Sequence, residues 1–465
     1  MSGTRDGAIA RAHRYFDDGS FVAELSRRVA IPSVSQEPDK RPALDLYVDE
    51  EMTGSLEALG FECAKHPNPH EDSGPILVAR RIEDESLPTV LTYGHGDVVR
   101  GLESGWSQGL DPWTVTRKGD RLYGRGTADN KGQHTVNLAA LDAVIKERGG
   151  SLGFNVVFVL EMMEERGSRG LREFCDANRD LLAADVMIAS DGPRLSPKHA
   201  NMFLGSRGGF NFRLDVKLRE GGHHSGHWGG VLEDPEIILS HAIASIVDRR
   251  GRILIPEWVP KQIPPLIREM LKDVEIDSGD EAPDFPEDWG EPGLSQAEKM
   301  LAWTSFIVLA SQNGNPDNPV NAVSDVASAW CQLRHTSDVD AGRFEPALRE
   351  HLDANGFQMV SIEADQRRRR RASRTDPANP WVGWARESMQ RTVGGNVVHV
   401  APNQSGGLPN DVFEDMGMPT LWFPHSYNGC SQHAPNEHML ASIAREGLGV
   451  MAGLFWDLAE NPPKS

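Results

Sequence analysis

The sequence predicts an α/β domain that is interrupted by a smaller inserted α+β domain. Short apolar strands and amphipathic helices alternate through the first 200 residues, which is typical of a largely parallel sheet covered by helices. After about residue 206 the strand candidates alternate apolar and polar positions, and after about residue 373 the first pattern returns. We therefore expect a first domain made of residues 1–206 and 373–465, with residues 207–372 as the insertion.

The size and composition of the chain agree with a multi-domain soluble protein. Its 465 residues exceed what one hydrophobic core normally supports, and 39% of them are hydrophobic while 25% are charged. The N-terminal stretch lacks the apolar core of a signal peptide, and no apolar run approaches the length of a membrane span. We therefore expect a cytoplasmic location.

The charge and the cysteines argue against several kinds of partner and site. A net charge of −20 disfavours nucleic acids and anionic membranes as partners. The basic run Arg367–Arg371 is an exception, but no aromatic residues interleave it, so we interpret it as a solvated surface or boundary stretch. The four cysteines lie far apart without a CxxC pair, which argues against a disulfide framework or a thiolate zinc site.

The first domain is predicted to contain three buried strands, with a helix between the first two. Each strand is short, apolar and rich in β-branched residues, and the helix has one apolar face. The predicted strands are Thr89–Tyr93, Phe154–Leu160 and Asp185–Ser190, and the helix is Lys131–Lys146. After residue 373 the domain resumes with a strand at Pro419–Phe423 and a closing helix at Glu437–Leu458.

The insertion is predicted to combine one-sided strands with two helices. Its strands are Phe210–Leu218, Ala327–Leu333 and Gln358–Ile362, and its helices lie around Pro235–Val247 and Arg343–Ala354. Residues 259–298 are rich in Pro, Asp and Glu, so we expect a long irregular excursion there.

Two adjacent carboxylates, Glu164 and Glu165, follow the predicted strand Phe154–Leu160 closely. Packing gives no reason to place two like charges at the end of a buried strand, because their repulsion is costly. A bound cation is the usual compensation. The pair therefore points to a metal site in which one carboxylate binds the ion and the other handles protons.

Other potential ligands follow the neighbouring strands. His95 and Asp97 come after the first strand in GHGD, and Asp191 comes after the third. Asp129 lies in the glycine-rich segment GRGTADNKGQ, directly before the predicted helix. Because ligands of parallel α/β sheets gather outside the carboxyl ends of the strands, we expect these groups to converge with the acidic pair.

Each of these motifs is weak evidence when taken alone. A single HxD is more often a surface turn than a pair of ligands, and an Asp after a strand is usually a helix cap. GRGTAD lacks the spacing of either phosphate-binding glycine loop, so a nucleotide site is not expected. The prediction of a metal site rests on the combination of these motifs, on their order in the chain and on their placement after the strands.

The sequence resembles the dinuclear zinc metallopeptidase and amidohydrolase family that includes aminoacylase-1, carnosine dipeptidases, acetylornithine deacetylase and succinyl-diaminopimelate desuccinylase. The resemblance rests on GHGD, GRGTADNKGQ, EMMEERGS and SDG in this order, and HSGHWGG, SGGLP and QHAPNE extend it over nearly the whole chain. It implies a zinc-peptidase catalytic domain with a mixed, largely parallel sheet. The insertion would then be a two-layer sandwich that serves for dimerisation and as a lid.

The resemblance also implies a site for two Zn²⁺ ions per subunit, although Co²⁺ or Mn²⁺ could occupy the same ligands. Asp129 would bridge the two ions, and His95 and Asp191 would bind opposite ions. Glu165 would bind one ion, and His433 of QHAPNE the other. Asp97 would orient His95 through its second ring nitrogen.

By the same resemblance, Glu164 would be the general base of an amide hydrolysis. The substrate would be an N-acyl amino acid or a dipeptide, and a metal-activated water would be the nucleophile. The alternative for Glu164 is a solvated neighbour of a true ligand. Two other functions remain open, a single-metal aminohydrolase on the same fold and a non-catalytic relative, and the complete ligand set argues against the second.

His224 is the next predicted site residue. It lies in GGHHSGHWGG with His223 and His227, so a further metal site or a solvated glycine-rich loop is also possible. The resemblance implies that His224 reaches across the interface of a homodimer and stabilises the oxyanion in the partner subunit's site. A monomer would then be inactive.

Four further residues are predicted to bind substrate. Arg334 ends a predicted strand and could bind a carboxylate, or it could be an ordinary edge-strand charge. The resemblance adds Asn321 to substrate binding, and Gly406 and Gly407 of SGGLP as donors of backbone amides, although a simple turn would also explain the two glycines.

Three segments depart from the family pattern. Asn130 replaces an acid that often follows the bridging Asp, and we expect little effect because the position is not a ligand. Met162 and Met163 replace the usual Gly and Glu. Cys430 lies close to the predicted ligand His433, where shaping the substrate pocket and plain packing are equally possible.

Overall fold

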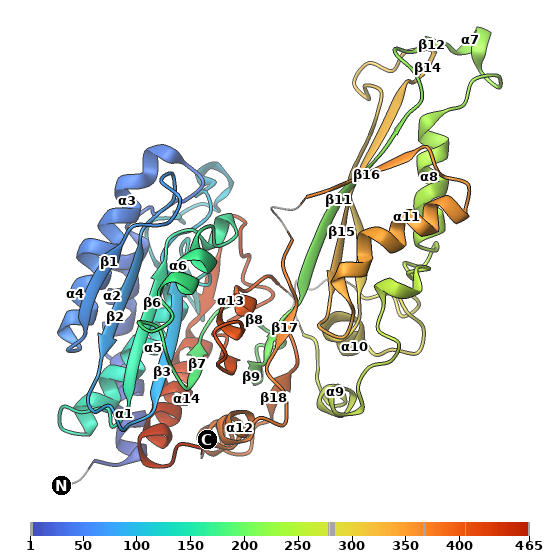
Figure 1. The fold of residues 1–465 in the computed structure, drawn as a ribbon. Coiled ribbons are helices and arrows are strands. Elements are labelled where there is room, and N and C mark those ends of the chain that lie inside the picture. The colour runs from blue at the N-terminus through green and yellow to red at the C-terminus, as the bar shows by residue number, and fades with distance from the viewer. Residues whose placement is uncertain (1–2, 278, 280–283, 366–368, 405, 464–465) are drawn as a thin grey trace.

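The computed structural model of this chain describes residues 3–277, 279, 284–365, 369–404 and 406–463. It contains an α/β domain and an elongated second domain that extends away from it (Figure 1). The chain enters the second domain after β10 (Gly205–Ser206) and returns through β17 (Ser373–Arg374). These two connecting strands pair with each other. The division into 1–206, 207–372 and 373–465 therefore remains our proposal for the domains.

The α/β domain is built on a sheet of eight strands with the order β1-β2-β6-β3-β7-β19-β9-β18. The pairs β6/β3, β3/β7, β7/β19 and β9/β18 are parallel, which confirms the predicted mixed, largely parallel sheet. The strands are β1 (Glu62–His66), β2 (Ile76–Arg81), β3 (Thr89–His95), β6 (Asn155–Glu161), β7 (Val186–Ala189), β9 (Ala200–Phe203), β18 (Val398–Ala401) and β19 (Thr420–Trp422). Of these, β1, β2, β9 and β18 were not predicted from the sequence.

Helices bury both faces of this sheet, which explains why its central strands are apolar throughout. Alternate residues of β6 enter different cores: Phe158 packs on one face and Val159 on the other. One face is covered by α1 (Arg5–Asp17), α2 (Ser20–Val29), α3 (Arg41–Leu46), α4 (Thr53–Ala58), α5 (Lys131–Glu147), α12 (Pro380–Val393) and α14 (Ala441–Glu460). The other is covered by α6 (Leu171–Ala177), α13 (Asn410–Glu414) and two helices of the insertion.

The closing helix begins later than the sequence predicts. Residues His438–Leu440 form β21, which pairs with β5 (Arg121–Tyr123), and β5 pairs with β4 (Thr116–Lys118). The helix α14 therefore starts at Ala441 instead of Glu437. The pairing anchors the segment that follows His433 to the domain. Two short strands, β8 (Pro193–Arg194) and β20 (Ser426–Tyr427), pair nearby.

The second domain is an antiparallel sheet with helices packed against it, which confirms the predicted α+β insertion. The strand order is β13-β15-β11-β16. The strands are β11 (Gly208–Lys217), β13 (Ser305–Asn313), β15 (Val326–His335) and β16 (Val360–Ala364), and the packed helices are α8 (Pro235–Ile246) and α11 (Phe344–Ala354). Strand β13 was not predicted, and it forms one edge of the sheet.

The far end of this domain carries a small tip (Figure 1). It consists of β12 (His223–His224), α7 (Ser225–Trp228) and β14 (Ala322–Val323), with β12 and β14 paired. Among the described helices of the whole chain, none has the length and apolar character needed to cross a membrane.

The acidic segment 259–298 is more ordered than the sequence predicts, although residues 278 and 280–283 lie outside the described part. It contains α9 (Pro265–Leu271), and α10 (Gln296–Leu301) begins at its end. Ile267 and Leu301 are buried in the second core of the α/β domain. Ile267 within the acidic segment and Leu301 directly after it therefore attach the insertion to the first domain.

Candidate functional site

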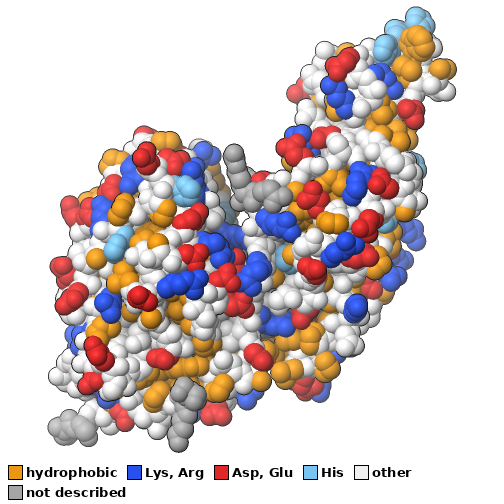
Figure 2. Space-filling view, in the orientation of Figure 1, with side chains coloured by type: hydrophobic (Ala, Val, Ile, Leu, Met, Phe, Trp, Pro, Cys, Tyr) orange, Lys and Arg blue, Asp and Glu red, His pale blue; other side chains and the backbone are white. Residues whose placement is uncertain are grey.

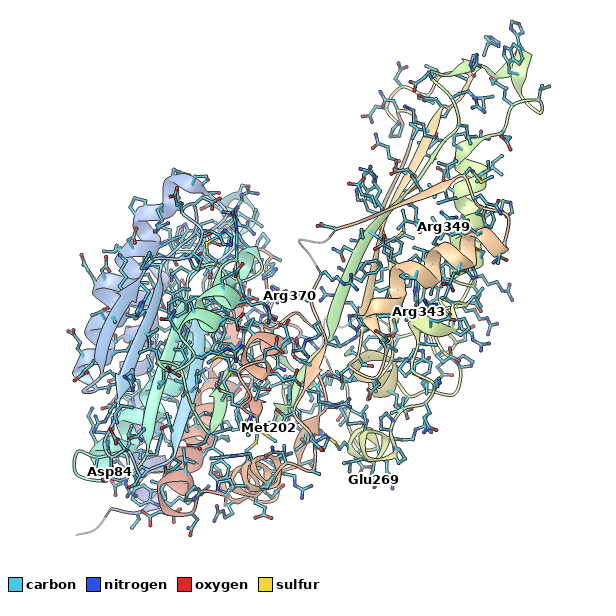
Figure 3. The ribbon with its side chains drawn as sticks, in the orientation of Figure 1. Asp84, Met202, Glu269, Arg343, Arg349 and Arg370 are labelled. Atoms are coloured by element: carbon cyan, nitrogen blue, oxygen red, sulfur yellow. The ribbon has the colours of Figure 1, made fainter. Side chains whose placement is uncertain are left out.

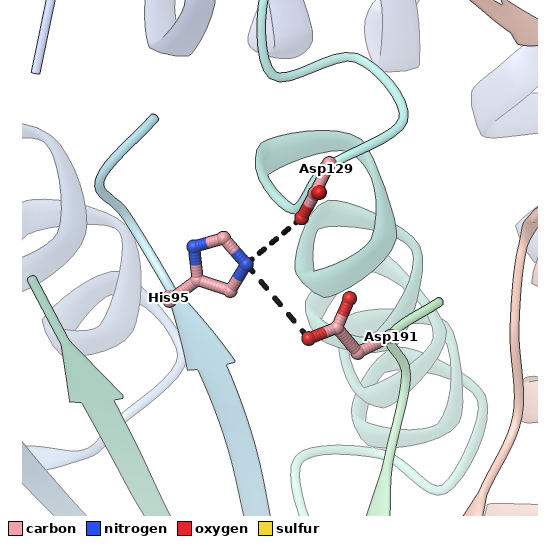
Figure 4. Close-up of side chains that lie close together, drawn as sticks. All are labelled: His95, Asp129 and Asp191. Atoms are coloured by element: carbon pink, nitrogen blue, oxygen red, sulfur yellow. Dashed lines mark hydrogen bonds and ion pairs between the residues drawn. The ribbon is translucent and has the colours of Figure 1, made fainter. Parts of the chain in front are cut away.

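Three predicted ligands meet where the strands β3 and β7 end (Figure 4). His95 is the last residue of β3, Asp191 follows β7, and Asp129 lies in the loop before α5. The His95 Nε2 atom lies 3.0 Å from Asp129 Oδ1 and 3.8 Å from Asp191 Oδ2. All three side chains are buried.

A second group of ligands shares Asp129 with the first. The His433 Nε2 atom lies 3.1 Å from Asp129 Oδ2 and 3.0 Å from Glu165 Oε2. Asp129 therefore turns one carboxylate oxygen toward each group, as a bridging ligand would. The grouping differs from our expectation in one detail: His95 and Asp191 lie in the same group, and Glu165 and His433 lie in the other.

The two groups contain buried carboxyl groups whose pKa values are raised. Burial, together with the charge of Asp129, raises the pKa of Glu165 to about 8. Burial is also the main cause that raises the pKa of Asp191 to about 7. Buried carboxylates of this kind are normally neutralised by protons or by a cation.

The donor atoms fit divalent transition metals. Within each group the potential ligand atoms lie within 4.8 Å of one another, a spacing that one ion can span with bonds of about 2 Å. Imidazole nitrogens and carboxylate oxygens without a thiolate suit Zn²⁺, Co²⁺ or Mn²⁺. The residues present therefore fit two cations that share Asp129.

Asp97 contacts one residue of each ligand group, His95 and Glu165. One of its oxygens lies 3.4 Å from His95 Nδ1, which leaves Nε2 facing the other ligands. Its two oxygens also accept the backbone N–H groups of Glu164 and Glu165, each at 3.1 Å. Asp97 is therefore placed to orient both His95 and the acidic pair, which extends its predicted role.

Glu437, the last residue of QHAPNE, supports the bridging carboxylate and was not predicted. Its Oε1 atom accepts the backbone N–H groups of Gly126, Ala128 and Asp129 at 3.0, 3.0 and 3.1 Å. Its Oε2 atom lies 2.5 Å from Arg125 Nη1. The acid at the end of the His433 motif was the available signal, but its partners are about 310 residues earlier in the chain.

Asn130 makes two structural hydrogen bonds at the site, whereas the sequence predicted little effect from this residue. Its Oδ1 atom accepts the backbone N–H of His95 at 3.4 Å, and its Nδ2 atom donates to the carbonyl of Ser190 at 2.8 Å. It thus links the ends of two strands that carry ligands. Cys430 is fully buried in a small apolar cluster with Ala128, and burial raises the pKa of its thiol to about 12. This surrounding points to packing.

A cavity of about 820 Å³ opens beside the two groups, at the junction of the domains. Glu164, Glu165 and His433 line one part of it, and the predicted substrate residues Arg334 and Gly407 also line it. Gly406 lies next to this wall, where a Cβ atom would come within 2.8 Å of Gln404 Oε1.

His224 and Asn321 are not brought to this cavity within the chain. Both are exposed at the tip, where the backbone N–H of Ser225 donates to the carbonyl of Asn321 at 2.9 Å. The imidazole rings of His224 and His227 stack with centroids 4.4 Å apart. Among the described residues, the tip histidines form no group with metal-ligand spacing.

The fold and the site together define a two-domain protein with a candidate dinuclear metal centre at the carboxyl ends of its central strands. Residues 91–457 match the model of peptidase family M20/M25/M40, and the chain belongs to this family.

Curated relatives share part or most of the chain. A Beta-Ala-His dipeptidase of Rattus norvegicus is 33% identical over 303 residues, which is 60% of this chain and 59% of that protein. The match thus spans less than two thirds of this relative. A cysteinylglycine-S-conjugate dipeptidase of Corynebacterium striatum is 29% identical and covers 83% of both chains. A Cys-Gly metallodipeptidase of Saccharomyces cerevisiae is 29% identical, covering 95% of this chain and 96% of the relative.

Solved structures have the same fold. A dipeptidase from Saccharomyces cerevisiae superposes with a TM-score of 0.78 at 21% identity, covering 99% of this chain and 100% of the other. Human carnosine dipeptidase 1 also has a TM-score of 0.78, at 22% identity, with 97% and 99% covered. These likenesses confirm the fold that the sequence predicts.

Replacement of Glu437 by Ala should weaken metal binding by about 10–100-fold, because the amides that hold Asp129 lose their acceptor. Competition with a chelator, followed by metal analysis, measures this. Glu460→Gln, at the exposed end of α14, is the matched control and should bind metal like the unmodified protein. Equal affinities in both variants would show that Glu437 does not support the centre.

Proposed function

We propose that this chain is a metal-dependent dipeptidase that hydrolyses the amide bond of short peptides. The observation that carries the proposal is the shared position of Asp129 between two ligand groups, with the carboxylate of Glu164 in the cavity that Glu165 and His433 also line. The dipeptidase names of the relatives favour dipeptides over the N-acyl amino acids that the sequence leaves equally open.

In this proposal, His95, Asp129 and Asp191 hold one cation, and Asp129, Glu165 and His433 hold the second. Two Zn²⁺ ions per subunit fit the ligands, and Co²⁺ or Mn²⁺ could replace them. Bound cations of this kind supply Lewis acidity, which polarises a carbonyl group and makes water more acidic.

Glu164 is the proposed general base. Its side chain is 16% exposed and lines the cavity, while its backbone N–H is held by Asp97 at 3.1 Å. Its carboxylate belongs to neither ligand group, and its one described ion-pair contact is a long one, with Arg370 Nη2 at 3.9 Å from Oε1. The carboxylate can therefore accept a proton from water. Glu164 would then pass this proton to the amine that leaves.

Arg334 and Gly407 are placed to bind the carboxylate end of a short peptide. Both line the cavity that Glu164, Glu165 and His433 also line. The guanidinium of Arg334 can bind a carboxylate through two parallel N–H groups, and the backbone of Gly406 and Gly407 can add amide donors. This arrangement favours substrates with a free carboxylate close to the scissile bond.

We further propose that the protein acts as a homodimer. Strand β13 is an edge strand of the second domain, and its Ile307 and Leu309 are 49% and 52% exposed. An exposed apolar edge of this kind is suited to cover by a second copy. His224 and Asn321 would then enter the partner's cavity from the tip, where His224 would stabilise the oxyanion.

Purified protein should hydrolyse dipeptides, and a chelator should abolish the activity. In Glu164→Ala, kcat should fall by about 10³-fold because the proton acceptor is lost, while metal analysis still finds two ions per chain. Asp142→Ala, on α5 and outside both ligand groups and the cavity, is a control for the loss of a carboxylate. Near-normal turnover of Glu164→Ala would remove its assigned role.

A complementation experiment tests the action of His224 across the dimer. Glu164→Ala and His224→Ala should each be nearly inactive alone. Co-expressed in equal amounts, they should recover about a quarter of the normal activity, because half of the dimers are mixed and each has one complete site. If the mixture stays inactive although mixed dimers form, or if His224→Ala alone is active, the proposed trans role is wrong.

A further inference from the structure

We infer that Arg370, together with Arg334, forms a subsite for a second substrate carboxylate, so that the enzyme prefers dipeptides with a C-terminal Asp or Glu. The inference rests on the proposed dipeptidase function and names the substrate class of that site. It also gives a function to part of the basic run Arg367–Arg371, of which residues 367 and 368 lie outside the described part of the chain.

Arg370 is held at the wall of the cavity by the connection between the domains (Figure 3). Its backbone exchanges two hydrogen bonds with Gly209, each at 3.0 Å, so the returning chain is paired with the outgoing chain at this point. This fixed backbone places the side chain between the metal ligands and the second domain. The backbone of Arg370 is therefore fixed by hydrogen bonds within the fold.

The guanidinium groups of Arg370 and Arg334 meet beside Gly407. A Cβ atom at Gly407 would lie 3.3 Å from Arg370 Nη1 and 3.6 Å from Arg334 Nη1. Two positive side chains and a backbone that a ligand can approach closely therefore share one stretch of the cavity wall. Figure 2 shows Lys and Arg side chains gathered on the surface where the two domains meet.

Arg334 and Arg370 have few hydrogen-bond and ion-pair partners among the described residues, although their two positive charges lie close together. Arg334 Nε donates to Gln332 at 3.2 Å, and no described carboxylate lies within ion-pair distance of its guanidinium. For Arg370 the described partner is Glu164, at 3.9 Å from Nη2, while its buried Nη1 has no hydrogen-bond acceptor. Burial and the neighbouring Arg370 both lower the pKa of Arg334.

The neighbouring arginines are satisfied within the protein. Arg172 pairs with Asp411 at 2.6 Å, and Arg371 pairs with Glu414 at 2.7 Å. Arg369 donates to the carbonyl of Ala341 at 2.7 Å and covers the ring of Phe210. Compared with these neighbours, Arg334 and Arg370 have N–H donors without a protein acceptor, and an anionic ligand can accept from them.

The charge balance favours two carboxylates over one. The α-carboxylate of a dipeptide neutralises one guanidinium and can also accept from the backbone at Gly406 and Gly407. A neutral C-terminal side chain would leave the buried Nη1 atom of Arg370 without a charged acceptor, because Glu164 faces Nη2 and lies 3.9 Å from it. A side-chain carboxylate supplies this acceptor.

The test compares two substrates of nearly equal shape, Ala-Glu and Ala-Gln. The unmodified enzyme should have a kcat/KM for Ala-Glu at least about tenfold above that for Ala-Gln. Arg370→Gln should lower the ratio of kcat/KM for Ala-Glu to kcat/KM for Ala-Gln by about tenfold, mainly through a higher KM for Ala-Glu. Loss of the contact between Arg370 and Glu164 changes both substrates alike and leaves this ratio unchanged.

Arg371→Gln is the matched control, because it removes the same charge one residue along, and the two carboxylates that pair with Arg371, those of Glu414 and Asp415, do not line the cavity. It should leave both substrates unchanged, and thermal melting of both variants should show that they are folded. The inference is overturned if the unmodified enzyme shows no preference for Ala-Glu, or if Arg370→Gln lowers both substrates equally. Failure to hydrolyse any dipeptide would instead overturn the proposed function and the subsite with it.

Discussion

The carboxylate of Asp129 is the constraint on which the rest of the site depends. It is buried, it turns one oxygen toward His95 and the other toward His433, and these two histidines come from opposite ends of the chain. Several acidic side chains crowd around it, and burial raises the pKa values of Glu165 and Asp191. Such an arrangement is unfavourable unless cations are shared across it.

The scaffold is organised to hold this carboxylate still. Glu437 fixes the loop of Asp129 through three backbone amides, and Arg125 fixes Glu437. Asp97 fixes His95 and the backbone of the acidic pair from the other side. The parallel strands β3 and β7 bring their own ligands to the same edge, so the position of the centre follows from the topology of the sheet.

The second domain adds what the centre cannot supply alone. Its base contributes Arg334 to the cavity wall, and the paired connection contributes Arg370. Its tip carries His224 and Asn321, which lie apart from the cavity of the same chain. In the proposed homodimer, this extension of the second domain away from the α/β domain would carry the tip to the cavity of the other copy (Figure 1).

The sequence predicts the fold class and the convergence of the candidate ligands at one edge of the sheet, because strand ends and ordered motifs are local features. It does not predict how the ligands divide, since the pairing of His95 with Asp191 depends on which strands are neighbours. The contacts of Glu437 with the loop of Asp129 were not predicted, because the two segments are distant in the chain. The run Arg367–Arg371 was interpreted as a solvated surface or boundary stretch, and Arg370 does lie in the connection between the domains. Composition alone carries no information on the cavity that this residue lines.

The central claim is that Asp129 bridges two cations, and anomalous X-ray diffraction from crystals grown with Zn²⁺ tests it most directly. The account predicts two peaks in each subunit, one on either side of Asp129, with His95 and Asp191 at one and Glu165 and His433 at the other. A single peak, or two peaks that do not share Asp129, would contradict it.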